Sequence, residues 1–79
     1  MNLSRKTGKT DPGDLAYRIR SSREAKGLSQ KAVAGVFGIR RNAVTSWELG
    51  ETRPDTTRMG KLAEVLGVSV GWLVSGSED

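Results

Sequence analysis

The sequence predicts an all-α fold, a compact bundle of five short helices. Apolar residues recur at helical spacing in five successive stretches, and a glycine follows each of the first four. No stretch alternates apolar and polar residues as a half-buried strand does, and the connections are short. At 79 residues, the chain has the length of one small domain.

Three parts are expected along the chain. Residues 1–12 are polar, basic and almost free of apolar side chains, so nothing there offsets the entropy cost of ordering, and we expect a flexible basic arm. Residues 13–76 hold the five helical stretches and are expected to form the domain. Residues 77–79 are expected to be a C-terminal tail.

The first two helices follow from their start and stop signals. The stretch Asp11-Pro12-Gly13-Asp14 combines a capping residue, a proline suited to a first helical turn and a second acid. A helix is therefore expected from there to about Lys26, with Gly27 as its end. Ser29 then caps a second, short helix. The apolar face of this second helix consists of Val33, Ala34 and Phe37, and Gly38 marks its end.

The other three helices are recognised in the same way. The third begins after Ile39 and ends at Gly50; Asp55 caps the fourth, which ends at Gly67; and Ser69 caps a short fifth helix. Their apolar residues are Val44 and Trp47 in the third, Met59, Leu62, Ala63 and Leu66 in the fourth, and Val70, Trp72, Leu73 and Val74 in the fifth.

One charged residue of the first helix does not fit an exposed position. Arg23 falls on the same face as Leu15 and Ile19, which should be buried. A buried arginine needs a carboxylate, and Glu48, one turn after the inward Val44, can supply one from the third helix. We therefore predict a partly buried ion pair between Arg23 and Glu48. The alternative is two exposed charges at the rim, worth less than about 1 kcal/mol.

Composition argues against several classes of function. The chain has no cysteine and no histidine, so a disulfide framework and the usual zinc, haem and catalytic-triad chemistries lose their main residues. It also lacks a glycine-rich phosphate loop and an obvious inward carboxylate pair, so we expect neither an enzyme nor a cofactor. No apolar run approaches the roughly 18 to 20 residues that span a bilayer, and no signal peptide is evident, so we expect a cytoplasmic protein without a membrane partner.

The charges are unevenly distributed. Thirteen Lys and Arg against nine Asp and Glu give a net charge of +4. Residues 1–44 carry ten basic and three acidic residues, whereas residues 45–79 carry three basic and six acidic ones. A basic half favours a polyanion as partner, although chance clustering on a solvated surface is the alternative.

The second and third helices, joined by Gly38-Ile39-Arg40, form a helix-turn-helix, a unit whose second helix can lie in the DNA major groove. Ala34 is small where the two helices cross, and Gly38 permits a tight stop. Arg40 and Arg41 stand at the start of the third helix, where the helix dipole disfavours cations. A phosphate or a base edge against this end would remove that conflict. Similar units also occur in helical proteins for packing alone.

A family resemblance extends over about Asp14 to Gly76. It is carried by LAYRIRSSREAKGLSQ, FGIRRNAV, TSWELGETRP and LAEVLGVSVGWLVSG, which resemble the lambda-repressor-like, Cro/C1-type (XRE-type) helix-turn-helix family. The resemblance implies a five-helix DNA-reading domain with the third helix as recognition helix. Many members are bacterial or phage repressors that act as dimers.

The resemblance also assigns roles to particular positions. It implies that Arg23 and Glu48 occupy the family's interhelical ion-pair positions. It further implies that Gln30 contacts the phosphate backbone and buttresses the recognition helix. The chain departs from the family pattern at Arg40, where Ser or Thr is usual, and at Gly60, where a larger apolar residue is common and glycine leaves less core.

The DNA contacts follow from the chemistry of the side chains. Arginine can bond guanine and asparagine can bond adenine in the major groove, so the base contacts are expected from Arg41, Asn42, Thr45 and Ser46. The phosphate contacts are expected from Gln30, Ser29, Lys31, Arg40 and Arg53. The candidate contacts of the arm, which could enter a minor groove, are Arg5, Lys6 and Lys9. A tail without this role is an equally good interpretation of the arm.

Together these features predict a sequence-specific regulator that binds double-stranded DNA. We expect a phage- or prophage-type repressor that binds a palindromic operator as a homodimer, in the bacterial nucleoid or a phage-infected bacterial cell. Trp72, Leu73 and Val74 of the last helix are the candidate dimer interface, although Trp72 also fits the core. The alternative is an antitoxin or adaptor-like module that acts mainly through a protein partner. The polar side chains of the third helix favour DNA.

Overall fold

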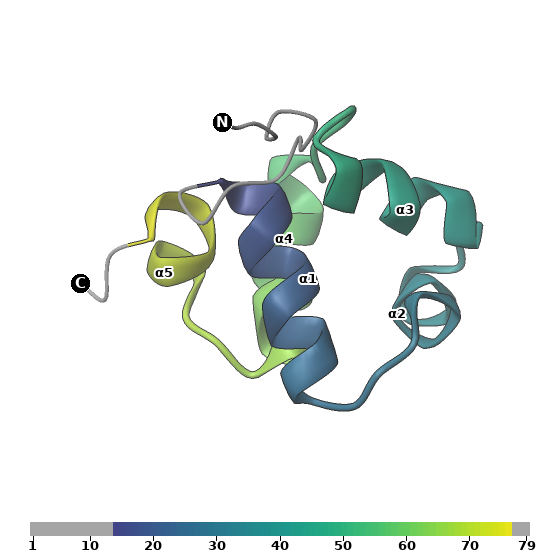
Figure 1. The fold of residues 1–79 in the computed structure, drawn as a ribbon, viewed down its shortest axis with the longest axis horizontal. Helices are drawn as coiled ribbons and strands as arrows, with labels where there is room; N and C mark the ends of the chain where they lie inside the picture. Colours follow the sequence, from purple (N-terminus) through teal and green to yellow (C-terminus); the bar gives the residue numbers. More distant parts are fainter. Residues whose placement is uncertain (1–13, 77–79) are drawn as a thin grey trace, which may run out of the picture.

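The computed structural model describes residues 14–76, and all regular secondary structure in this part of the chain is helical (Figure 1). The helices are α1 (Leu15–Ala25), α2 (Gln30–Phe37), α3 (Arg41–Leu49), α4 (Thr56–Leu66) and α5 (Val70–Ser75). α2 and α3 pack together at one end, α1 and α4 lie in the middle, and α5 packs on both of these at the other end (Figure 1). The predicted all-α fold with five helices is confirmed.

Three helices begin where a side chain caps them. Ser29, Asp55 and Ser69 each accept a hydrogen bond from the backbone N–H three residues further on, at 2.9, 3.0 and 3.1 Å. Each bond satisfies an amide that the helix itself leaves without a partner. Thr57 Oγ1 also donates to Asp55 at 2.7 Å, and this bond is the main reason why the pKa of Asp55 lies below its ordinary value. The caps predicted for α2, α4 and α5 are confirmed.

The predicted start of α1 is wrong. The helix begins at Leu15, and Asp14 in the N-cap position has an extended backbone with φ −93° and ψ 149°. Because an extended residue interrupts a helix, α1 cannot continue back through Asp14 to a cap at Asp11. The acid nearer the helix is therefore the N-cap residue. Pro12 lies outside the described residues.

All five helices contribute to one core. Its fully buried large side chains are Ile19, Val33, Val44, Leu62, Leu66 and Leu73. Between α2 and α3 the ring of Phe37, at the end of α2, meets that of Trp47, near the end of α3, edge to face, with 6.1 Å between the ring centroids. Gly38 ends α2 with φ +66°, a left-handed conformation that glycine adopts without strain. These contacts fix the angle at which α3 leaves α2.

A second buried arginine, Arg18, was not predicted. Its side chain lies under α5, and only 5% of the residue is exposed. Its Nε donates to the carbonyl of Leu73 at 2.9 Å, and its Nη2 donates to that of Val74 at 3.0 Å. The last carbonyls of a helix lack intrahelical partners and favour a nearby cation. Arg18 therefore attaches the end of α5 to α1.

Gly60 does not reduce the core, contrary to the expectation drawn from the family pattern. It lies on the exposed face of α4, and a Cβ atom added there would meet nothing within 4 Å. A larger apolar residue at this position would face solvent. The remaining cost of this glycine is its low helix propensity, about 1 kcal/mol relative to alanine.

Candidate nucleic-acid interface

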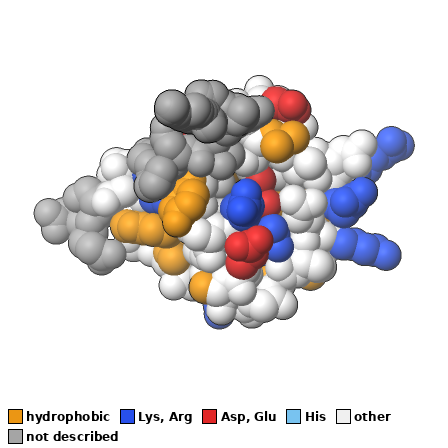
Figure 2. Space-filling model, viewed as in Figure 1, with side chains coloured by type: hydrophobic (Ala, Val, Ile, Leu, Met, Phe, Trp, Pro, Cys, Tyr) orange, Lys and Arg blue, Asp and Glu red, His pale blue; other side chains and the backbone are white. Residues whose placement is uncertain are grey.

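The end of the molecule formed by α2 and the start of α3 is basic. Residues 25–47 contain four basic residues and no acidic one. Three of these cations, Lys31, Arg40 and Arg41, are exposed at this end, and we call them the basic end. Figure 2 shows Lys and Arg side chains projecting from the part of the surface where α2 and α3 lie. Such a cluster attracts a polyanion.

The start of α3 concentrates positive charge. Arg40 is the N-cap residue and forms no side-chain capping bond, and the helix itself begins at Arg41. The first turn contains no acidic residue. Both arginines therefore stand where the helix dipole is positive, an arrangement that becomes favourable when an anion lies against it.

The four predicted base-contact residues lie on one face of α3. Arg41 and Asn42 are exposed, and Thr45 and Ser46, one turn further on, are half-buried. Ser46 Oγ donates a long hydrogen bond of 3.4 Å to Glu51 Oε1. This polar face is opposite the apolar side chains that α3 packs into the core.

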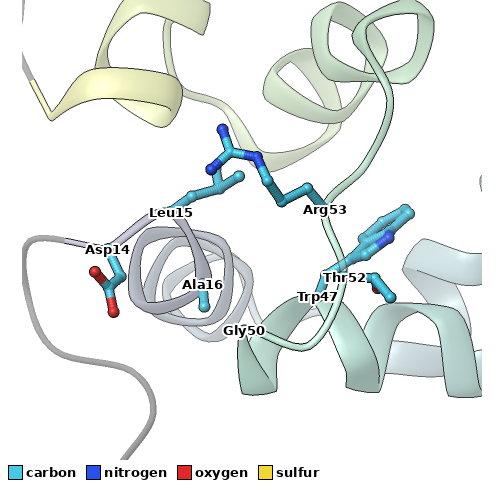
Figure 3. Close-up of a pocket in the computed structure, with 7 residues that line it drawn as sticks. All are labelled: Asp14, Leu15, Ala16, Trp47, Gly50, Thr52 and Arg53. Atoms are coloured by element: carbon cyan, nitrogen blue, oxygen red, sulfur yellow. The ribbon is translucent and has the colours of Figure 1, made fainter.

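The predicted phosphate contacts fall in two places. Lys31 and Arg40 belong to the basic end, with Ser29 and Gln30 next to Lys31 at the start of α2, whereas Arg53 lies in the connection between α3 and α4. Figure 3 shows the Arg53 side chain extended over Leu15 at the start of α1. It borders a pocket of about 250 Å³ whose lining residues are Asp14, Leu15, Ala16, Trp47, Gly50, Thr52 and Arg53. Arg53 is therefore separate from the basic end.

The predicted ion pair between Arg23 and Glu48 is present beneath this surface. Arg23 Nε donates to Glu48 Oε2 at 2.6 Å, and Arg23 Nη2 donates to Glu48 Oε1 at 3.0 Å. The two residues are 9% and 3% exposed. Arg23 Nη1 also donates to the carbonyl of Leu28 at 2.8 Å. The bond to Glu48 raises the pKa of Arg23 above its ordinary value, so the guanidinium stays charged.

Gln30 joins this ion pair to the outward face of α3. Its Nε2 donates to Glu48 Oε1 at 2.9 Å, and its Oε1 accepts a hydrogen bond of 2.8 Å from Thr45 Oγ1. Gln30 thus holds α3 at two points, which agrees with the buttressing role that the resemblance implies. The bond to Thr45 was not predicted, because it depends on the crossing of α2 and α3 and has no signature in the residue spacing.

The candidate dimer interface on α5 needs a correction. Leu73 is fully buried in the core, so its side chain cannot contact a partner. Trp72 is half-buried and packs against the core. Val74 is 40% exposed, and Val70, which was not assigned to the interface, is 45% exposed. A helix of six residues is too short for its apolar spacing to distinguish these faces.

Other predicted features have limited or no structural description. The arm residues Arg5, Lys6 and Lys9 lie outside residues 14–76. Within that range, no group of three or more acidic, histidine or cysteine side chains is placed to hold a metal ion. The longest described helices have 11 residues, and none of the described helices is long and apolar enough to cross a membrane.

Two adjacent helices joined by a short turn, with a basic and polar outer face, are typical of a helix-turn-helix protein. A family model described as helix-turn-helix matches residues 19–73. The chain therefore belongs to the lambda-repressor-like, Cro/C1-type (XRE-type) helix-turn-helix family, as its sequence predicts.

Among its relatives is the SPbeta prophage-derived uncharacterized HTH-type transcriptional regulator YonR of Bacillus subtilis, which is 37% identical over 60 residues. These residues are 76% of this chain and 56% of the relative, so the chain spans about half the length of that protein.

Two solved structures show the fold in different settings. The P22 c2 repressor in complex with a synthetic operator has a TM-score of 0.74 and 28% identity, over 80% of this chain and 96% of that one. Hydroxypropylphosphonic acid epoxidase from S. wedmorenis has a TM-score of 0.71 and 33% identity, over 84% of this chain and 35% of the epoxidase. The likeness to that enzyme is therefore confined to about a third of its chain.

Removing one partner of the buried ion pair is expected to destabilise the domain strongly. Glu48→Ala removes the carboxylate that Arg23 and Gln30 share, and leaving a buried charge unpaired costs about 3 to 5 kcal/mol in the free energy of unfolding. Urea-induced unfolding measures this loss. Glu24→Ala is the matched control, because Glu24 is exposed and lies 3.6 to 3.8 Å from two arginines; it should cost less than about 1 kcal/mol. Equal stability of Glu48→Ala and the parent would contradict the prediction.

Proposed function

We propose that this chain is a sequence-specific regulator of transcription, of the phage- or prophage-repressor type, that reads a palindromic operator as a dimer. The observation that carries the proposal is the start of α3, where two exposed arginines stand at the positive end of the helix and the first turn contains no acid. The relatives support it, since one is named a prophage-derived transcriptional regulator and another is a repressor in complex with an operator.

The proposed contacts divide into two classes. Arg41, Asn42, Thr45 and Ser46 contact base edges in the major groove, with Arg41 placed to bond the O6 and N7 atoms of guanine. The phosphate contacts come from Ser29, Gln30, Lys31, Arg40 and Arg53, which fix the register of the protein on the duplex without reading its sequence.

We further propose that the second copy binds at α5. Val70 and Val74 of α5 are both at least 40% exposed. Figure 2 shows hydrophobic side chains on the surface over α5, away from the basic end. A dimer formed through this surface leaves both recognition helices free for DNA. Two half-sites then double the contacts of a domain that alone reads few base pairs.

Selection from randomised duplexes tests the function directly. The protein is incubated with the pool at several salt concentrations, and the enriched sequences are determined. We expect one palindrome to be enriched, because two copies of α3 would read inverted half-sites. Weak binding that is steeply salt-dependent and enriches no sequence would contradict the proposal and favour a module that acts through a protein partner.

The two classes of contact predict different effects of alanine substitution. Arg41→Ala is expected to cost about 1 to 3 kcal/mol on the selected site and to relax the preference at one base pair. Arg53→Ala is expected to weaken binding to all sequences alike and to lower the salt slope by about one. Titrations of specific and random duplexes measure both effects. Arg20→Ala removes the same charge from the exposed face of α1 and serves as the control. Equal losses on both duplexes for Arg41→Ala would make it a phosphate contact.

Val74→Asp is expected to prevent dimer formation without unfolding the domain, because the side chain is 40% exposed. Binding to the palindrome should weaken, whereas binding to a single half-site should not change. Sedimentation of protein–DNA mixtures gives the number of copies bound. Gly60→Asp adds the same charge at an open position of α4 and is the matched control. Cooperative binding by Val74→Asp at the level of the parent would exclude this surface as the interface.

A further inference from the structure

Thr45 connects the core of the domain to its proposed base-reading face. Its Oγ1 lies 2.8 Å from Gln30 Oε1 and 3.2 Å from the backbone carbonyl oxygen of Arg41. Both of these partners can only accept a hydrogen bond, whereas a threonine hydroxyl has one proton to donate and two lone pairs. The proton is therefore directed into the protein, and only lone pairs remain for a group that approaches from outside.

The orientation of the Gln30 amide determines which way the Thr45 proton points. An ionised carboxylate can only accept, so Gln30 must turn its Nε2 toward Glu48, at 2.9 Å. The opposite orientation would place the amide oxygen against the carboxylate and an N–H group against Thr45. Gln30 therefore presents its oxygen to Thr45, and Thr45 must donate.

The carboxylate is in turn held by the buried arginine. Arg23 can only donate, and it binds both oxygens of Glu48, at 2.6 and 3.0 Å. Glu48 is 3% exposed, so it is not free to turn toward solvent and exchange this partner for water. We call the series Arg23, Glu48, Gln30 and Thr45 the polarity relay, because each member fixes the hydrogen-bond direction of the next.

We propose that Thr45 reads a base that carries an amino group in the major groove, the N6 amino group of adenine or the N4 amino group of cytosine, and that the polarity relay sets this preference. The inference rests on the proposed function and adds a substrate class to it. Guanine and thymine present the acceptors O6 and O4 instead, to which lone pairs cannot bond. A threonine outside such a relay can pair with either class.

Thr45→Val tests the proposal, because valine keeps the shape of the side chain and removes the hydroxyl. Selection from randomised duplexes is carried out with the parent, Thr45→Val and Thr45→Ser. We expect the parent to favour adenine or cytosine over guanine and thymine at one position of each half-site. Thr45→Val should reduce this ratio about fivefold at that position alone, the size of one ordinary hydrogen bond. Thr45→Ser, which keeps the hydroxyl, should retain the preference.

Gln30→Met tests whether the relay sets the preference. It removes the 2.8 Å acceptor and leaves Thr45 only the longer bond to Arg41, so its hydroxyl can turn outward. The ratio of amino to keto bases should fall at the position read by Thr45, while the preference at other positions is kept. A uniform loss of affinity with an unchanged ratio would show that Gln30 only supports α3, and would overturn the relay. Thr57→Val, at an exposed hydroxyl bonded to Asp55, is the control and should change no position.

The outcomes separate this inference from the proposed function. If the parent enriches no sequence, the proposed function fails and the inference fails with it. If the parent enriches a site but Thr45→Val alters no position, the function stands and the inference is overturned. The inference is also overturned if the altered position is one at which the parent prefers guanine or thymine. Thermal unfolding of each variant verifies that the domain is folded.

Discussion

The buried bond between Arg23 and Glu48 is the interaction on which the proposed recognition surface depends. It joins α1 to α3. Arg23 also donates to the carbonyl of Leu28, and Glu48 accepts from the amide of Gln30, so the pair holds the chain just before α2 and at its first residue. A buried ion pair often adds little net stability compared with well-packed apolar residues. Apolar residues could fill the same space, but they could not fix the direction of the Gln30 amide. The role of the ion pair is therefore better understood as fixing the orientation of the Gln30 amide than as adding net stability.

α1 carries two buried arginines that act on opposite parts of the molecule. Arg18 binds the last carbonyls of α5, and Arg23, five residues later, binds the carboxylate of α3. One 11-residue helix thus holds both the proposed dimer surface and the proposed reading surface. In a dimer, the distance between two recognition helices must match the half-site spacing. A rigid connection through α1 would fix that distance.

The sequence predicts interactions between residues close together in the chain. It predicts contacts between distant residues only where a buried charge requires a partner. Capping residues such as Ser29 act within three positions, so they are visible in the sequence. The pairing of Arg23 with Glu48 followed from a charge on a buried face. Arg18 was missed because its partners are backbone carbonyls some 55 residues away, which no side chain reveals. Leu73 was misplaced because its helix is too short to show a face. The predicted DNA contacts within residues 14–76 lie on α2 and α3 or just before these helices, except for Arg53, and their partners on DNA do not follow from the fold.

In the proposed DNA interface, affinity for DNA and selectivity among sequences come from different groups. The cations of the basic end attract any duplex, and this attraction weakens as salt rises. Selectivity instead needs groups whose hydrogen-bond direction is fixed before DNA arrives, because a hydroxyl that can rotate accepts either class of base. Arg41 can only donate by its chemistry, whereas Thr45 donates its one proton inside the protein and, in the proposed contact, offers DNA only its lone pairs. One turn of α3 would then present a donor, Arg41, and an acceptor, Thr45, to neighbouring bases. The accepting character of Thr45 would originate in the ion pair inside the core.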